Sequence, residues 1–290
     1  MMAELAALAP FAGRELLAAA LVFLRVAGAV SVFPAFGETA VPLRIRLAIA
    51  VALTMAVAPA VGGIADEAAA TAGLAWQEAA PRPGQGIDAG PGTGGERPGG
   101  GGPAAALALV LTEVAIGLAF GLTLRLFVQA LATAGAMIAQ ATGLSQLFGA
   151  GGNEPTAAVA QLLVLGGVTL ALSAGLHVQA AAALIWTYAA FPPGRPPDPS
   201  LLADWHLETL AAGFVLAFRM AAPFLVAGLV WNLALGAVNR AMPQILATLA
   251  GAPATMAGAL VLLLLLLPEG LRLWTDAFAA FLAAPAEIPP

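Results

Sequence analysis

The sequence contains no cysteine and no lysine, and only 9% of its 290 residues are charged. A soluble domain carries roughly 25% charged residues, so an ordinary water-soluble globule is excluded. The absence of cysteine excludes disulfides, thiolate metal sites and cysteine nucleophiles. Two histidines are too few for a histidine-built metal centre, and a net charge of −5 argues against a nucleic-acid partner. We therefore expect no cofactor, no metal and no nucleic acid.

Apolar residues dominate what is present, at 61% of the chain. A helix needs about 20 apolar residues to cross a hydrocarbon core of roughly 30 Å. One apolar segment, 157–190, is long enough for one helix plus an extension or a sharp hairpin. We predict an all-α, polytopic integral membrane protein with a single membrane domain over 1–290. The six candidate segments are 15–36, 45–64, 104–128, 157–190, 205–236 and 244–267.

Two stretches differ from these segments. Residues 73–103 hold eleven glycines and five prolines with almost no large apolar side chains, which predicts a disordered insert outside the bilayer. In the C-terminal segment 268–290, four apolar residues recur at spacings of three and four, with charged residues elsewhere. This pattern predicts an amphipathic helix suited to an interface or to another subunit. The four residues are Leu271, Trp274, Phe278 and Leu282.

Five ionisable residues interrupt the apolar segments, and each costs about 2.5–3.5 kcal/mol at the centre of a membrane helix. They are Arg25, Glu113, Arg125, His177 and Arg219. Such residues are candidates for a functional site, but they also pair with one another or with partner subunits to hold helices together. For His177, between two small residues and a glutamine, we expect an interhelical hydrogen bond.

Two sequence patterns bear on packing and catalysis. Gly117 and Gly121 form a GxxxG pair one turn beyond Glu113, which predicts close approach of a neighbouring helix. Ser145 invites comparison with an intramembrane serine protease, but Gln146 replaces the glycine of a GxSG motif. No phosphate loop, metal-ligand set or nucleotide fingerprint occurs, so we do not expect an enzyme.

A glycine-rich stretch over 143–155 lies between two long apolar segments. Non-helical backbone at such a position is tolerated where protein buries it or where it faces a water-filled cavity. Two interpretations remain open here. The stretch is either a loop over or inside a pore, with Phe148 as an apolar stopper, or a plain surface loop.

Several blocks in sequence order resemble one family. Residues 23–28, 34–37 and 41–46 are similar to the N-terminal signature of the flagellar export-gate proteins FliR and their injectisome counterparts SctT. The most similar block is Asn-Leu-Ala-Leu-Gly over 232–236 running into Asn-Arg-Ala-Met-Pro-Gln over 239–244. Glu113, Gly117, Gly121 and His177 also fall where that family has similar residues. The resemblance covers nearly the whole chain apart from the insert and the tail.

The resemblance implies a non-enzymatic structural and gating subunit of the flagellar type III export gate, in the inner membrane at the flagellar basal body. It implies assembly with FliP-like and FliQ-like subunits into a channel for unfolded export substrates, with an FlhB-like protein at the entrance. In the family, the hydrophobic segments are largely bent hairpins packed on partner subunits. The competing hypothesis is a small-molecule permease or channel, which the composition fits equally.

The resemblance also implies site residues. A channel plug maps onto the loop after the Gly-Leu-Ser motif, at Leu147, Phe148, Gly149, Gly151 and Gly152. For Asn239, Arg240 and Gln244, which follow an apolar helix, the residues themselves favour capping of the free carbonyls at its end. Their place in the most distinctive block suggests subunit contact as an alternative.

Overall fold

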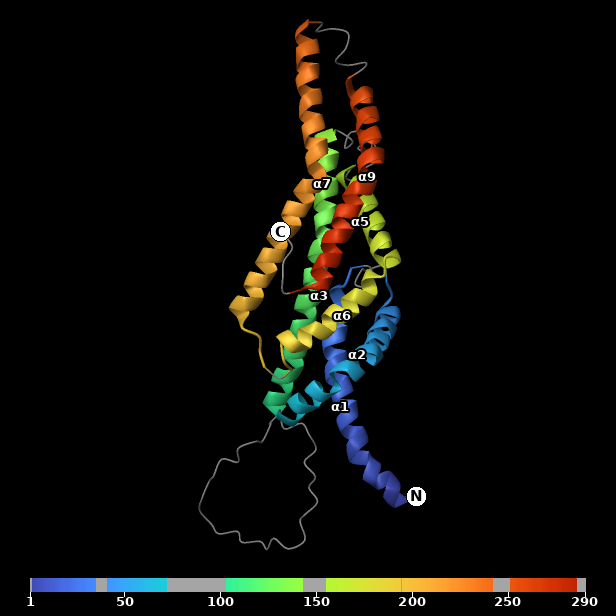
Figure 1. Ribbon diagram of the computed structural model, residues 1–290, viewed down its shortest axis with the longest axis vertical. Coiled ribbons are helices and arrows are strands. Elements are labelled where there is room, and N and C mark those ends of the chain that lie inside the picture. Colours follow the sequence, from blue (N-terminus) through green and yellow to red (C-terminus); the bar gives the residue numbers. More distant parts are fainter. Residues whose placement is uncertain are drawn as a thin grey trace. The chain divides into compact units, whose positions relative to one another are not determined.

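The computed structural model contains seven described helices (Figure 1). It describes residues 2–34, 41–71, 103–142, 155–193, 195–241 and 251–285. The insert predicted over 73–103 therefore lies outside the described residues, except for Pro103. The helices are α1 (Met2–Val32), α2 (Leu43–Thr71), α3 (Pro103–Thr142), α5 (Pro155–Ser173), α6 (Leu176–Ala190), α7 (Pro199–Ala241) and α9 (Gly251–Ala283).

The chain forms two compact units. Unit 1 comprises residues Met1–Leu122 and Leu184–Pro199, and unit 2 comprises Thr123–Ala183 and Ser200–Pro290. The long helix α3 contributes its first half to unit 1 and its second half to unit 2, whereas α6 contributes its first half to unit 2 and its second half to unit 1. Elements far apart in the sequence thus share one interior in each unit.

Proline and glycine set several helix boundaries. Helices α3, α5 and α7 each begin at a proline, whose fixed φ angle suits the first helical position and whose missing N–H costs nothing there. Helix α5 ends before Gly175, whose φ of +75° is a left-handed conformation that favours glycine. The chain turns by 77° at this point and continues as α6.

The all-helical, polytopic fold class is confirmed, but the number of candidate spans differs from the expected six. Within the part of the chain that the structure describes, four helices are long and apolar enough to cross a membrane, or five if the bent pair α5–α6 is one span. The segment predicted over 15–36 is not counted among these helices, because the apolar helix described there covers only Leu16–Val32. The third predicted segment ends too early, since α3 continues to Thr142 with alanine, glycine and threonine in place of larger side chains.

The helix in the C-terminal segment begins before the predicted residue 268, because α9 passes through Pro268 without a break and ends at Ala283. Its apolar residues form the aromatic core of unit 2. Trp274 is fully buried, and its indole Nε1–H donates to the backbone oxygen of Phe127 at 2.7 Å. The Phe127 ring lies 4.9 Å from that of Phe281 and 5.2 Å from that of Phe278. This face of α9 packs on its own chain.

Candidate functional site

A buried ion pair lies at the centre of unit 1. Arg25 of α1 donates from Nε to Glu113 Oε2 of α3 at 2.8 Å and from Nη2 to Glu113 Oε1 at 3.1 Å. Both side chains are fully buried. The two parallel bonds fix the guanidinium and the carboxylate in one plane, which is the strongest form of this pairing.

The remaining N–H groups of Arg25 bind the end of α6. Nη1 donates to the backbone oxygen of Thr187 at 3.0 Å and to its Oγ1 at 3.3 Å, and Nη2 donates to the backbone oxygen of Phe191 at 3.0 Å. The guanidinium carbon also lies 3.9 Å from the centre of the Tyr188 ring, in a cation–π arrangement. All five guanidinium N–H groups therefore have an acceptor. Arg25 joins α1, α3 and α6 through one side chain.

This arrangement is suited to holding helices together. A lone charge in an apolar interior is strongly unfavourable, and removal of one partner from a buried pair costs about 3–5 kcal/mol. Neither Arg25 nor Glu113 lines the groove described below, and both are shielded from solvent. A proton relay or a conduction pathway would need contact with water, so the geometry favours a structural role.

The contact between α1 and α3 is unusually close because glycines replace side chains there. A Cβ atom added at Gly117 would overlap the backbone oxygen of Arg25, and one at Gly121 would overlap the backbone oxygen of Ala29. On the opposite helix, a Cβ at Gly28 would lie 2.8 Å from the backbone oxygen of Val114. Close backbone approach is the role expected of GxxxG spacing in membrane helices. It brings Arg25 within reach of Glu113.

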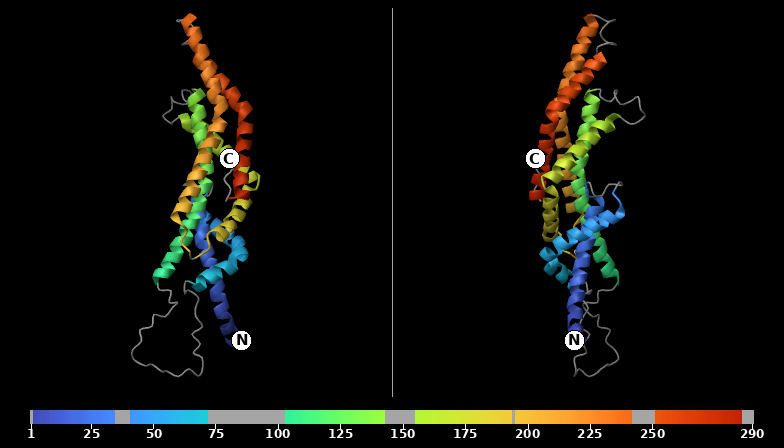
Figure 2. Two further views of the ribbon diagram at one scale, coloured as in Figure 1. Left: turned by 60° about the vertical axis from the view of Figure 1, so that its left-hand side comes forward. Right: turned by 90° about the vertical axis from the view of Figure 1, so that its right-hand side faces the viewer.

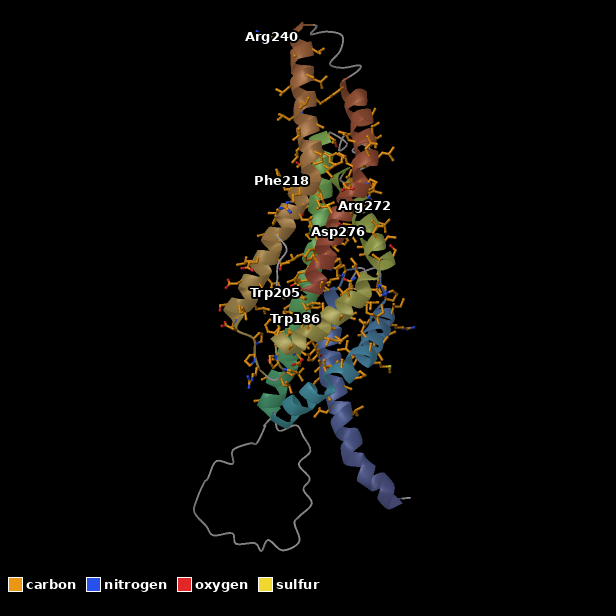
Figure 3. All side chains as sticks on the ribbon, viewed as in Figure 1. Trp186, Trp205, Phe218, Arg240, Arg272 and Asp276 are labelled. Atoms are coloured by element: carbon orange, nitrogen blue, oxygen red, sulfur yellow. The ribbon has the colours of Figure 1, made fainter. Side chains whose placement is uncertain are left out.

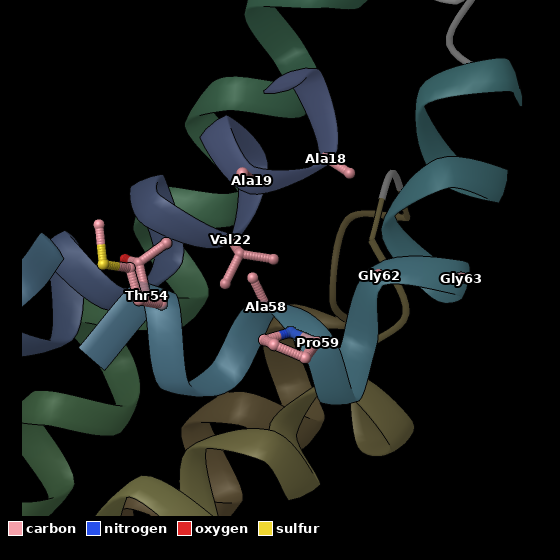
Figure 4. Close-up of a pocket in the computed structure, with 9 residues that line it drawn as sticks. Ala18, Ala19, Val22, Thr54, Ala58, Pro59, Gly62 and Gly63 are labelled. Atoms are coloured by element: carbon pink, nitrogen blue, oxygen red, sulfur yellow. The ribbon is translucent and has the colours of Figure 1, made fainter. Parts of the chain in front are cut away.

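A groove of about 480 Å³ lies between α1 and α2 (Figure 4). Small and apolar residues line it, among them Ala18, Val22, Ala58 and Pro59. The one hydroxyl in the lining, on Thr54, donates to the backbone oxygen of Ala50 at 2.7 Å. The groove presents no charged or nucleophilic group. Among the described residues, no cluster of acids or histidines is arranged to hold a metal ion.

The other predicted site residues are not brought to this centre. His177 is exposed at the start of α6, and no hydrogen bond of its ring is found within the described part of the chain. Arg125, Arg219 and Arg240 are exposed. The side chain of Asn239, the residue Gln244 and the whole predicted plug lie outside the described residues. The plug residues are Leu147, Phe148, Gly149, Gly151 and Gly152.

Sequence reasoning missed the α6 part of the cluster, which consists of Thr187, Tyr188 and the backbone oxygen of Phe191. A signal was present, because Tyr188 is the only tyrosine in the chain and sits in an apolar segment directly after a threonine. Tyrosine usually finds a hydrogen-bond partner when buried. Tyr188 is 1% exposed, and its hydroxyl has no such partner among the described residues. The stacking of the Tyr188 ring on the Arg25 guanidinium explains why this tyrosine is buried here.

The sequence of this chain matches a known family of bacterial export proteins over most of its length. Residues 16–281 match the family described as bacterial export proteins, family 1. The chain belongs to this family. It is 34% identical to the flagellar biosynthetic protein FliR of Caulobacter vibrioides over 266 residues, which cover 91% of this chain and 94% of the relative. It is also 26% identical to FliR of Escherichia coli K12 over 250 residues, covering 84% and 82% of the two chains.

A third relative matches over a shorter region. FliR of Aquifex aeolicus is 32% identical over 164 residues, which are 56% of this chain and 63% of that protein. The family match spans the buried cluster of unit 1 and the aromatic core of unit 2, since it runs from before Arg25 to Phe281. Both interiors therefore belong to the family domain.

Proposed function

We propose that this chain is a structural and gating subunit of the flagellar type III export gate, which helps to form the channel for unfolded flagellar proteins. Membership of the bacterial export family and similarity to FliR over nearly the whole length support this function. The chain is a non-enzymatic component of the apparatus and lies in the bacterial inner membrane. Its partners are FliP-like and FliQ-like subunits, with an FlhB-like protein at the channel entrance.

One observation carries the proposal beyond family membership: two apolar helices are far longer than a bilayer is thick. The candidate span in α3 covers Ala106–Thr142, 37 residues that include an 18-residue window with a mean hydropathy of 2.1. The candidate span in α7 covers Pro199–Val238, 40 residues that include a window with a mean hydropathy of 1.9. At 1.5 Å per residue these helices extend for about 55 and 60 Å, against a hydrocarbon core of about 30 Å. Lipid cannot cover both along their whole length.

Large apolar side chains are nevertheless exposed along these helices. On α7 they run from Leu201, 59% exposed, to Leu233, 66% exposed. Apolar surface that extends beyond the bilayer is stable only when protein covers it. Partner subunits are therefore part of the folded state of this chain. A small-molecule permease would instead have helices of bilayer length around a site with polar groups.

Co-isolation tests this function. The tagged chain, extracted from membranes of cells that also express FliP-like and FliQ-like proteins, should elute with both, and deletion of its gene should abolish export of flagellar proteins. The competing permease hypothesis requires transport of a small solute by the purified chain alone in vesicles. Solute transport by the chain alone, without co-isolation, would overturn the proposal.

The gating part of the proposal concerns the segment 143–154, which connects α3 to α5 in unit 2. These helices pack closely just before it, since a Cβ added at Gly135 of α3 would meet the backbone of Ala160 of α5. A plug at Phe148 predicts that Phe148→Ala, or deletion of 149–152, makes the closed gate leaky to ions. Phe127→Ala, a core change at an equally large aromatic residue, is a control for general destabilisation. An unchanged leak in the Phe148 variant would remove this residue from the plug.

A further inference from the structure

Helix α2 has a proline in its interior, at Pro59. Because proline has no N–H, the backbone oxygen of Met55, four residues earlier, lacks the donor that an α-helix normally supplies. Both residues line the groove between α1 and α2, where Met55 is 72% exposed. The groove therefore contains a backbone acceptor that its own helix leaves without the usual donor.

The lining of the groove offers acceptors and no spare donor. The hydroxyl of Thr54 donates to the backbone oxygen of Ala50 at 2.7 Å, so only its lone pairs are left for an occupant. None of the other lining side chains carries an N–H or O–H group, and none is charged. A charged donor would be buried here without a counter-charge, which is strongly unfavourable. The groove is therefore suited to a neutral donor, such as a hydroxyl or a side-chain amide.

Small residues leave room for a second helix in the groove. Figure 4 shows Val22 of α1 opposite Ala58 of α2, with Gly62 and Gly63 about one turn further along. A Cβ atom added at Gly62 or Gly63 would meet nothing within 4 Å. Small residues allow the backbone of another helix to come close. A side chain of that helix can then reach the backbone oxygen of Met55.

Helix α9 provides a comparison, because it also has an internal proline on an exposed side. Pro268 deprives the backbone oxygen of Leu264 of its donor in the same way. It is followed by Glu269 and Arg272, which are 78% and 77% exposed (Arg272 is labelled in Figure 3). Water that hydrates such charges is also available to a free carbonyl. In α2, by contrast, residues 47–65 contain no ionisable group.

We propose that a helix of a neighbouring gate subunit packs in the groove between α1 and α2, and that a neutral donor on this helix binds the backbone oxygen of Met55. Lipid acyl chains carry no donor, so lipid in the groove would leave this oxygen unsatisfied at a high cost. The inference rests on the proposed function, because the partner belongs to the same export gate. It adds the place of contact and the chemistry that recognises the partner.

Pro59→Ala tests the proposal, because it returns an N–H to α2 and closes the helical bond to the Met55 oxygen. In the purified chain alone this variant should raise the denaturant midpoint, since proline is unfavourable inside a helix. In cells that also express the FliP-like and FliQ-like proteins, the same variant should lower the yield of assembled gate by about tenfold, as expected for the loss of one hydrogen bond. A residue that only shapes its own helix would not change stability and assembly in opposite directions.

Pro268→Ala is the matched control. It should also raise the denaturant midpoint of the purified chain, but it should leave the yield of assembled gate unchanged. An equal loss of assembly in the Pro268 and Pro59 variants would show a general effect of straighter helices and would overturn the proposal.

Filling the groove is a second test that does not depend on the proline. Gly62→Leu adds a side chain where the chain itself leaves open space, so the purified chain should stay as stable as before while the yield of assembled gate falls. Ala60→Leu is the control, because Ala60 is exposed on α2 but does not line the groove. Equal yields for the two variants would contradict a partner helix in the groove.

Cross-linking identifies the occupant. Because the chain has no cysteine, Gly63→Cys carries a single photoreactive label in the assembled gate. The label should attach to a helix of a FliP-like, FliQ-like or FlhB-like protein, within one turn of a serine, threonine, asparagine or glutamine. An apolar substitution of that partner residue should lower the yield with the unmodified chain but not further with Pro59→Ala, because both changes remove the same bond.

The outcomes separate this inference from the proposed function. Attachment of the label to lipid alone, or additive losses in the paired substitutions, would overturn the inference about the groove. If the unmodified chain co-isolates with its partners and Pro59→Ala co-isolates equally well, only that inference fails. If the unmodified chain does not co-isolate with any of them, the proposed function fails as well.

Discussion

The interiors of the two units are stabilised by different interactions. Unit 1 closes around an ion pair that binds three helices through directed hydrogen bonds, at a place where glycines bring two backbones together. Unit 2 closes around Trp274 and phenylalanine rings, with the aromatic side chains of α9 packed on α3. Directed bonds tolerate little change in position, whereas an apolar core adapts to changes of similar volume. The first interior should therefore be the more sensitive to single substitutions.

Removal of one member of the ion pair should have the largest effect. Arg25→Ala or Glu113→Ala leaves a buried charge without a partner and should destabilise the chain by about 3–5 kcal/mol. The measurement is the denaturant midpoint of the purified chain in detergent, together with the yield of assembled gate. The paired control is Arg25→Met with Glu113→Leu, which removes both charges and should recover much of the loss. A double variant as unstable as either single variant would contradict the ion-pair account.

Glycine substitutions should come next, and the sign of their effect on stability should depend on whether the glycine is closely packed. Gly117→Ala forces α1 and α3 apart at the Arg25 carbonyl and should cost about 1–3 kcal/mol. Gly236→Ala in α7 meets nothing within 4 Å and should stabilise the helix by up to about 1 kcal/mol. Thermal unfolding of the two purified variants in the same detergent measures this contrast. Equal shifts in the same direction would refute the close-contact role of Gly117.

The aromatic core of unit 2 should respond more moderately to a conservative change. Trp274→Phe keeps an aromatic ring but leaves the backbone oxygen of Phe127 without its donor, at a cost of about 1–3 kcal/mol. Leu273→Ala on the exposed side of the same turn should cost less. Near-ultraviolet circular dichroism during thermal unfolding follows the tryptophan environment. A larger loss for Leu273→Ala than for Trp274→Phe would contradict the assigned core.

The smallest effect is expected at the exposed ion pair of unit 2. Arg272 and Glu269 are 3.9 Å apart and largely exposed, so the contribution of their attraction to the stability of the chain should be below about 1 kcal/mol. Arg272→Ala is the direct counterpart of Arg25→Ala, with the same substitution in the other unit. Denaturant midpoints in high and low salt separate the two, because only the exposed pair is screened. A loss of stability as large as that of Arg25→Ala would contradict the difference that we expect between the two units.

The sequence predicted the helical class and the residues of the ion pair more successfully than the extent of the helices. Arg25 and Glu113 were identifiable because an ionisable group in an apolar segment is rare and costly. The end of α3 was missed because small residues give a weak hydropathy signal, even though they make good helices. The continuation of α9 through Pro268 was missed because packing of Trp274 and Phe278 compensates for the hydrogen bond that a proline removes (Figure 2 shows α9 as one helix in both views).

The sequence by itself determined that the chain is a membrane protein without cysteine chemistry, because composition fixes where the chain is stable and which groups it carries. Ordered blocks of residues also determined its family. Only the tertiary structure decided that Arg25 pairs with Glu113 and also binds the end of α6, since these contacts join positions 88 and more than 160 residues apart. The GxxxG pattern predicts that a helix approaches closely at Gly117 and Gly121, but only the tertiary structure shows that this helix is α1 and that it carries Arg25 to Glu113.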